Sequence, residues 1–493
     1  MPEEQFPKAS NQQFECQYWQ LDTAAPAEFG QALALKGDFQ FTVPLKTIKL
    51  QTQAATHTLL AIQVSFDGAQ WSTYSRGAET DAESIDLANQ AVRYVRLIAS
   101  SNATDTNEHT MQENEFFDAV GIKQITFVSG VGVLAVPAPE WSDLLPQKEG
   151  WTGGDGIYSF DLTDLDDQSR VAFVFGDSFI GKVDQPTRHL VNDVMINNSM
   201  AVLDGQQPNP TKIRFSYQTD QNQKPVSLFT PAKNLNLRKD AYFWMQDGVL
   251  IGERLHFLPL IVVPNPEGRE GFEFAFEGVV HLSVAVKDGR IDLDSVTQEF
   301  APMRYRADNG KETIFTSAYL RKAHYPQADD LLYAYGVQEW ETHRPVVARM
   351  VAKDFAHFDT WEYYNGTTWV KDPKAAVPVA PEVSSEFSVS YCESGFYAGK
   401  YVLIWQEWGP GGRLCMYTAD RPEGPFTHKL PLYYEHEAEH SSTIYVYNAK
   451  AHLALSSNDE LLVSYNVNTT SWDEHEENAD IYHPRFVRLI QLQ

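Results

Sequence analysis

Short apolar or alternating runs bounded by Gly, Asn, Asp and Pro recur along almost the whole chain, and they constrain its fold more than any other feature. Such runs are typical of β-strands, because successive side chains of a strand point to opposite faces of a sheet. No long segment keeps a helical period, so the sequence predicts an all-β fold. The clearest runs cover residues 47–50, 59–64, 92–98, 122–128, 171–175, 249–260, 331–337, 401–405 and 461–467.

Length and charge narrow the possible functions. The chain has 493 residues, which predicts two or more domains, and 43% hydrophobic residues, which are enough for packed cores. Asp and Glu number 66 against 39 Lys and Arg, for a net charge of −27. Such a surface repels phosphate backbones and anionic lipids, so we expect neither a nucleic-acid nor a membrane partner. A protein acting on neutral ligands fits this charge better.

Three cysteines, Cys16, Cys392 and Cys415, are too few and too odd in number for a disulfide framework. We therefore predict buried free thiols. The first residues are acidic, with no apolar leader, and no stretch approaches the length of a membrane span. This predicts a cytoplasmic protein, or a secreted one if a leader precedes these residues.

A boundary between domains is predicted near residues 129–148, where glycines and the run Pro137-Ala138-Pro139 interrupt the strand pattern. Residues 10–130 before it have the size of one β-sandwich. We interpret residues 131–148 as a linker and residues 149–493 as a larger all-β domain.

The first of these regions contains a recognisable pattern. Residues 60–71 join a strand to an Asp-Gly turn and a tryptophan, and residues 91–97 and 121–127 supply two later strands. Together they resemble the discoidin-type (coagulation factor C) β-sandwich, a jelly-roll. That resemblance implies a carbohydrate-binding module, although the matched residues belong to the framework and do not identify a ligand.

The second region repeats a strand-turn-strand theme five times, which predicts propeller blades. Residues 419–426, Ala-Asp-Arg-Pro-Glu-Gly-Pro-Phe, resemble a blade signature of family 43-type glycoside hydrolases, with Asp420-Arg421 departing from its usual Ser. Residues 461–468 resemble the closing blade of arabinanase-like propellers. The resemblance implies a five-bladed β-propeller that hydrolyses a neutral oligo- or polysaccharide with paired carboxylates. It implies no required cofactor and leaves a structural calcium ion open.

Four carboxylates stand beside predicted strands and are the candidate catalytic residues: Asp155, Asp177, Asp247 and Glu386. Asp155 and Asp177 each follow a glycine, which suits either a hairpin turn or a close approach to a ligand. Glycoside hydrolysis needs one neutral carboxylic acid and one ionised carboxylate. The family resemblance implies two assignments. In one, Glu386 is the general acid, Asp155 or Asp177 the base or nucleophile, and Asp247 an orienting group. In the other, Asp155 and Asp177 form the catalytic pair.

Aromatic and basic side chains are the candidate substrate ligands. Tryptophans can stack on sugar rings, an arginine can bind a hydroxyl or carboxylate, and the resemblance implies a histidine near the channel. Buried packing is the competing interpretation for each. The candidates are Trp151, Trp244, Arg344, Trp408, His440 and His452.

Two other functions compete with hydrolysis. A glycoside phosphorylase needs a cationic phosphate site, for which Arg304, Arg306 and Arg344 are candidates. A carbohydrate-binding propeller without catalysis would place Asp155 and Asp177 pointing away from each other. Finally, the acidic run at residues 473–477 is interpreted as a solvated loop.

Overall fold

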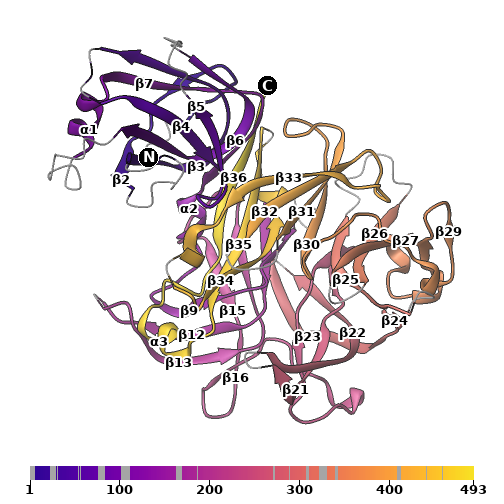
Figure 1. Ribbon diagram of the computed structural model, residues 1–493. Coiled ribbons are helices and arrows are strands. Elements are labelled where there is room, and N and C mark those ends of the chain that lie inside the picture. The colour runs from indigo at the N-terminus through magenta and orange to yellow at the C-terminus, as the bar shows by residue number, and fades with distance from the viewer. Residues whose placement is uncertain are drawn as a thin grey trace. The chain divides into compact units, whose positions relative to one another are not determined.

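The computed structural model describes residues 6–22, 29, 32–53, 55, 57–75, 84–100, 112–162, 169–185, 187–269, 272–287, 289–306, 310–320, 330–338, 342–407, 412–439, 441–457 and 459–493. The fold is nearly all β, as predicted, and its strands form two compact units (Figure 1). Unit 1 comprises Met1–Pro137 with Pro431–Tyr434 and Arg488–Gln493; unit 2 comprises Ala138–Leu430 and Glu435–Val487. Among the described residues, no helix is long and apolar enough to cross a membrane.

Unit 1 is built around two long strands, β3 (Ala32–Thr52) and β6 (Ser84–Ser100), which pair antiparallel with shifts of register. The shifts let long strands bend, because each adds an unpaired residue to the ladder. Shorter strands continue the sheet on both sides: β1 (Gln13–Phe14), β2 (Tyr18–Leu21), β4 (Leu59–Ser65), β5 (Trp71–Ser75), β7 (Ile122–Ser129) and β8 (Gly132–Pro137).

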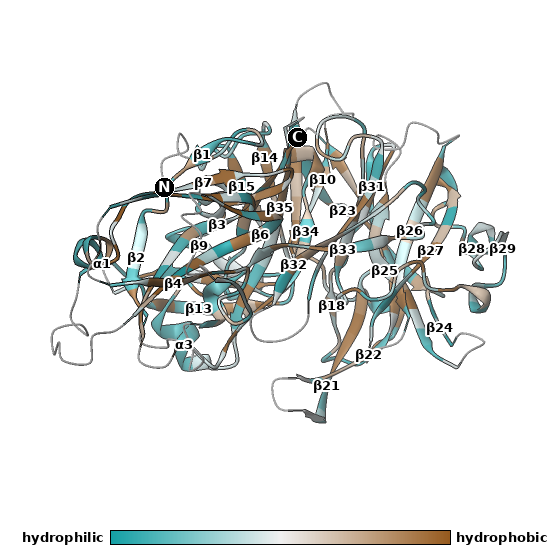
Figure 2. Ribbon diagram, turned by 45° about the horizontal axis from the view of Figure 1, so that its top comes forward, coloured by the Kyte–Doolittle hydropathy of each residue, from teal (hydrophilic) through white to brown (hydrophobic). Residues whose placement is uncertain are grey.

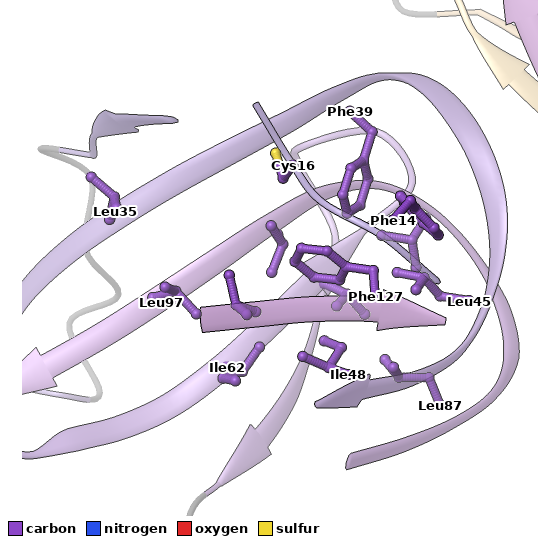
Figure 3. Close-up of a cluster of buried hydrophobic side chains, with 14 of the residues drawn as sticks. Phe14, Cys16, Leu35, Phe39, Leu45, Ile48, Ile62, Leu87, Leu97 and Phe127 are labelled. Carbon is purple, nitrogen blue, oxygen red and sulfur yellow. The ribbon is translucent and has the colours of Figure 1, made fainter. Parts of the chain in front are cut away.

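The core of unit 1 is aromatic at its centre (Figure 3). Phe39 and Phe127 meet edge to face with ring centroids 4.8 Å apart, and Phe14 packs against both. All three rings are buried. Burial of each contributes about 1.5–3 kcal/mol relative to exposure, which makes this cluster a main source of the unit's stability.

The segment predicted as a linker, residues 131–148, contains regular secondary structure on both sides of the boundary between the units. Strand β8 pairs with β3 within unit 1, and helix α2 (Pro139–Ser142) begins unit 2. Glycine and proline mark the ends of these short elements, so the composition that predicts a linker also fits a strand and a turn of helix.

The strands of unit 2 form a series of antiparallel sheets along the chain. The first sheet holds, in chain order, β10 (Tyr158–Asp161), β11 (Arg170–Phe175), β14 (Ser199–Asp204) and β15 (Ile213–Ser216). The second holds β18 (Tyr242–Trp244), β19 (Gly248–Ile251), β20 (Arg254–Phe257), β21 (Leu260–Arg269), β22 (Phe272–Lys287) and β23 (Arg290–Ala301).

The remaining sheets follow the same antiparallel plan. The third holds β24 (Arg304–Arg306), β25 (Glu312–Leu320), β26 (Leu331–Gln338), β27 (Arg344–Val351), β28 (Glu362–Tyr364) and β29 (Trp369–Val370). The fourth holds β30 (Phe387–Cys392), β31 (Lys400–Gln406), β32 (Arg413–Ala419) and β33 (Thr427–Tyr434). After these come β34 (Ile444–Ala451), β35 (Glu460–Thr469) and β36 (Arg485–Leu492), which are neighbours in one sheet; the residues of β36 from Arg488 on belong to unit 1. A separate three-stranded sheet holds β9 (Glu149–Gly154), which precedes β10, with β12 (Ser178–Val183) and β13 (Leu190–Ile196), which lie between β11 and β14 in the chain.

Consecutive sheets of unit 2 pack face to face through separate hydrophobic clusters. Figure 2 shows hydrophobic stretches along β22, whose side chains take part in this packing. As a result, β10, β19, β25, β30 and β34 are successive neighbours, and η11 (Leu453–Leu455), which follows β34, lies against β10. Residues distant in sequence therefore meet along these strands.

Two smaller predictions have definite outcomes. The three cysteines are free and buried, as predicted. The acidic run at 473–477 is not a loop but part of helix α3 (Trp472–Glu477), whose hydrophilic character is visible in Figure 2. Ser471 caps this helix, and the Glu474 carboxylate accepts a hydrogen bond from the Thr443 hydroxyl at 2.6 Å. These local bonds satisfy the acidic residues and hold the helix in place.

Candidate active site

Asp155 and Asp177 are joined through their backbones. The Asp155 amide donates to the Asp177 carbonyl at 3.1 Å, and the Gly176 amide donates to the Asp155 carbonyl at 2.8 Å. Gly156, with φ of +61°, turns the chain directly after Asp155 into a conformation that glycine adopts without strain. The two aspartates therefore face one site from the end of β9 and the start of β12.

The Asp155 side chain is buried, with 5% of its surface exposed. Its Oδ2 accepts a hydrogen bond of 2.6 Å from the Tyr447 hydroxyl, while its Oδ1 has no hydrogen-bond partner among the described residues. Burial raises the pKa of Asp155 to about 6, the Tyr447 bond opposes this rise, and the negative charge of Glu386 adds to it.

The pKa of Asp177 is raised as well. The Asn197 side-chain amide donates to its Oδ1 at 3.2 Å. Burial, together with the charge of Asp155, raises the pKa of Asp177 to about 7. Because two neighbouring carboxylates resist being ionised together, the pair holds one proton over a range near neutral pH.

Gly176 leaves space for this pair. A Cβ at this position would lie 2.5 Å from Asp155 Oδ1 and 3.4 Å from the indole Nε1 of Trp244. Both atoms are buried and lack a hydrogen-bond partner within the described part of the chain. One hydrogen-bond acceptor, Asp155 Oδ1, and one donor, Trp244 Nε1, therefore lie beside Gly176 without partners. Buried polar atoms in packed cores are ordinarily paired, so this arrangement favours a ligand site.

Glu386 lies near Asp155 but in a different environment. Lys450, from β34, forms an ion pair with it, with Nζ 2.6 Å from Oε2, and the Tyr158 hydroxyl donates to the same oxygen at 2.8 Å. Only 1% of the lysine side chain and 5% of the glutamate side chain are exposed. The lysine ammonium also lies over the Tyr158 ring, 4.2 Å from its centroid. Oε2 of Glu386 is thus held by a buried cation and a buried hydroxyl donor.

Sequence reasoning missed Lys450, Tyr158 and Tyr447. The available signal was weak: Lys450 is a lysine inside a strand, opposite Ser464. Such a residue is ordinarily assigned to the solvent face of a strand. Its buried partner is 64 positions earlier in the sequence, where no local pattern connects the two.

Asp247 has a bridging role in the structure. Its Oδ1 accepts from the Gly248 amide at 2.8 Å and its Oδ2 from the Tyr319 amide at 2.7 Å, which links the start of β19 to β25. It is buried, and its charge contributes to raising the pKa of Tyr158. Asp247 therefore lies in the same acidic surroundings with both oxygens occupied by backbone donors.

Two of the candidate substrate ligands are packed away from solvent. Trp151 is 1% exposed, donates to the Ser199 hydroxyl and stacks on Phe215, so its ring belongs to the core. His452 is fully buried, and its two ring nitrogens bond to the hydroxyls of Ser159 and Ser464. Burial lowers the pKa of His452 to about 3, so it is neutral. The contacts of both side chains are internal, and their binding of sugar stays a prediction.

The other candidates differ in position. Trp244 is half-buried beside Gly176 and so borders the acids. Arg344 is exposed at the start of β27. Trp408 and His440 lie outside the described residues. Within the described part of the chain, no three His, Cys, Asp or Glu side chains are grouped to hold a metal ion.

The fold and the site together define an all-β protein with a buried group of coupled carboxylates. A family model described as "Domain of unknown function (DUF5005)" matches residues 139–492, which is most of unit 2. The chain belongs to this family. A search of curated proteins found no match.

Solved structures provide a comparison of fold. The crystal structure of a "putative hydrolase" from Bacteroides ovatus is similar, with a TM-score of 0.56 and 19% identity, over 72% of this chain and 90% of that one. Two further likenesses are weaker. A thermostable family-43 glycoside hydrolase has a TM-score of 0.32 and 11% identity, over 69% of this chain and 90% of that one. The levansucrase of Bacillus subtilis has a TM-score of 0.38 and 9% identity, over 71% and 86%.

Proposed function

We propose that this chain is a glycoside hydrolase whose catalytic domain is a five-bladed β-propeller formed by unit 2. The proposal rests on one observation above all: Asp155 and Asp177 share a buried site, and their pKa values are raised to about 6 and about 7. Acid/base cleavage of a glycosidic bond requires one protonated and one ionised carboxyl group. The successive sheets of unit 2, in which β10, β19, β25, β30 and β34 are neighbours in turn, support the propeller assignment.

We assign the acid role to Asp177. Asp155 accepts the short Tyr447 bond and lies near Lys450, and both stabilise its ionised form. Asp177 has the Asn197 amide and borders the Asp155 charge, so it takes the shared proton first. In the reaction, Asp177 protonates the leaving oxygen as the bond to the anomeric carbon breaks. Asp155 either accepts the proton of the attacking water or bonds to the anomeric carbon itself.

Glu386 takes a supporting role in this proposal instead of that of general acid. A general acid must have a proton free to give to the leaving oxygen, whereas Oε2 of Glu386 is occupied by the Lys450 ammonium and the Tyr158 hydroxyl. Its negative charge lies close enough to Asp155 to raise the pKa of that group. Glu386 and Lys450 thus set the electrostatic surroundings of the pair, and Asp247 holds β19 against β25.

Unit 1 is proposed to be an accessory discoidin-like module that binds carbohydrate, as its sequence pattern suggests. The structural support is its own core, with Phe14, Phe39 and Phe127 at the centre. Sugar binding by unit 1 is testable by titrating saccharides into the whole chain after the Asp155 and Asp177 sites have been disabled, because unit 2 catalysis then does not consume the ligand.

The test of hydrolysis is a screen of aryl-glycosides and oligosaccharides on wild type, Asp155→Asn and Asp177→Asn. We expect each variant to lose about 10²–10⁴-fold in kcat/KM, the usual contribution of an acid or base. Asp473→Asn, at an exposed position of α3, is the matched control and should retain full activity. The anomer released, read by NMR, distinguishes retention from inversion.

Two outcomes would redirect the proposal. Cleavage that needs inorganic phosphate and releases a sugar phosphate would indicate a phosphorylase. Saccharide binding without cleavage, or equal cleavage by wild type and both active-site variants, would show that the pair is not catalytic.

A further inference from the structure

A cavity of about 450 Å³ lies next to the proposed catalytic pair. Two of its lining residues connect it to Asp177: Asn197 donates a hydrogen bond to the Asp177 carboxylate, and Tyr242 is close enough for the Asp177 charge to help raise its pKa to about 12. The side chain of Asn197 therefore separates the cavity from Asp177, the proposed general acid. In the proposed reaction, a sugar unit next to the cleaved bond would extend into the cavity.

The wall of this cavity is basic. Lys233, Arg238 and Lys239 line it, on the segment between β17 (Pro225–Val226) and β18. Arg238 is neutralised by an ion pair with Asp240 at 2.8 Å. Lys233 and Lys239 have no ion pair with any described residue. Two uncompensated cations are unexpected at a functional cavity of a chain whose net charge is −27.

A second cavity of the same unit shows that this basicity is local. It has about 250 Å³ and is lined by Asp161, Glu393 and Glu460, with no basic residue in its wall. The cationic lining thus belongs to the cavity beside Asp177 and is not a general property of the hollows of unit 2.

We propose that the cavity beside Asp177 is a subsite for an oxyanion, supplied by an acidic saccharide that carries a carboxylate, sulfate or phosphate group. This inference rests on the proposed function and specifies its substrate class. The lysines would attract the anion through charge, and polar lining groups such as Ser227, Thr230 and Asn236 would bind neighbouring hydroxyls. The expectation of a neutral substrate came from total charge, which does not report the charge of one cavity.

The lysines would also reduce the repulsion between such a substrate and the two aspartates. An anionic sugar brought toward Asp155 and Asp177 would be repelled by their shared negative charge. Cations that line the same cavity offset part of this repulsion, and salt screens exposed charges over about 8–10 Å at physiological ionic strength. We therefore expect binding to weaken as salt rises.

The experiment measures binding by titration calorimetry in the Asp155→Asn chain, so that turnover does not interfere. The probes are saccharides carrying one carboxylate, sulfate or phosphate, each with its neutral counterpart, and inorganic phosphate alone. The test variant is Lys233→Gln/Lys239→Gln. Its control, Lys212→Gln/Lys224→Gln, removes the same charge from exposed positions outside the cavity.

We expect at least one acidic saccharide to bind more tightly than its neutral counterpart, and the test variant to weaken it by about 2- to 30-fold, as two exposed charge contacts allow. The control should change it less than 2-fold, about the level of one weak contact. If no charged probe binds better than its counterpart, or both variants act alike, the subsite does not exist. Loss of cleavage in Asp177→Asn tests the hydrolase proposal separately.

Inorganic phosphate distinguishes two sources of the anion. Tight binding of phosphate alone, lost in the test variant and accompanied by phosphate-dependent cleavage, would support the oxyanion site and identify free phosphate as its occupant. Tight binding of acidic saccharides with weak phosphate binding would identify the substrate as the source.

Discussion

The ion pair of Lys450 and Glu386 offers the sharpest physical test of the site. The change is Lys450→Met, which keeps the length of the side chain and removes its charge. The carboxylate left behind is 5% exposed, and the Tyr158 hydroxyl still donates to its Oε2. Breaking a buried pair in this way costs about 3–5 kcal/mol, because an unpaired charge remains out of water.

The double variant Lys450→Met/Glu386→Gln leaves no unpaired buried charge. It should therefore recover at least about 2 kcal/mol of the lost unfolding free energy near pH 7.

The assay is urea unfolding of the full chain near pH 7, followed by circular dichroism and tryptophan fluorescence. Lys400→Met is the matched control, because its pair with Asp420 is exposed on both sides and should contribute little. If Lys450→Met resembles this control, the pair does not hold a buried charge and our assignment of Glu386 fails.

Three further predictions concern Asp155 and Asp177, the proposed catalytic pair. Gly176→Ala should reduce kcat/KM by at least about 100-fold, because its Cβ would displace Asp155 Oδ1; Gly278→Ala, whose Cβ would make only ordinary contact, should not. Asp177→Asn should stabilise the fold by about 2 kcal/mol near pH 8 and by little near pH 4, measured by urea unfolding. The sign follows because a raised carboxyl pKa lowers folded stability as pH rises from about 4 to about 7; equal stability at both pH values would contradict it. Tyr447→Phe removes a donor to the Asp155 carboxylate, so the acidic limb of the pH–rate profile should move up by about 0.5–1 unit, and an unmoved limb would contradict the bond.

The site shows where sequence reasoning reaches its limit. Asp155 and Asp177 could be selected because each follows a glycine at a strand end, and both lie in the buried group. The family resemblance implies Glu386 as the general acid in one of two open assignments. Its contact with Lys450 comes from the packing of β34 beside β30, which no local pattern reports.

Two tryptophans also show that local sequence does not separate core residues from site residues. Trp151 and Trp244 have similar strand settings in the sequence, yet one is a core residue stacked on Phe215 and the other borders the acids. Which face of a strand meets a neighbouring sheet depends on how the sheets pack, and no local pattern reports it.

Local sequence was enough to establish the all-β class, most strand positions, the free cysteines and the acids at strand ends. These features follow from side-chain alternation, turn residues and composition, all of which act over a few neighbouring positions. Packing of the sheets, in contrast, established that Lys450 neutralises Glu386, that Asp155 and Asp177 perturb each other, and that two lysines line the adjacent cavity. The physical reason is that charge states and cavities depend on distances and burial between segments far apart in the chain, and those distances exist only after the sheets have packed.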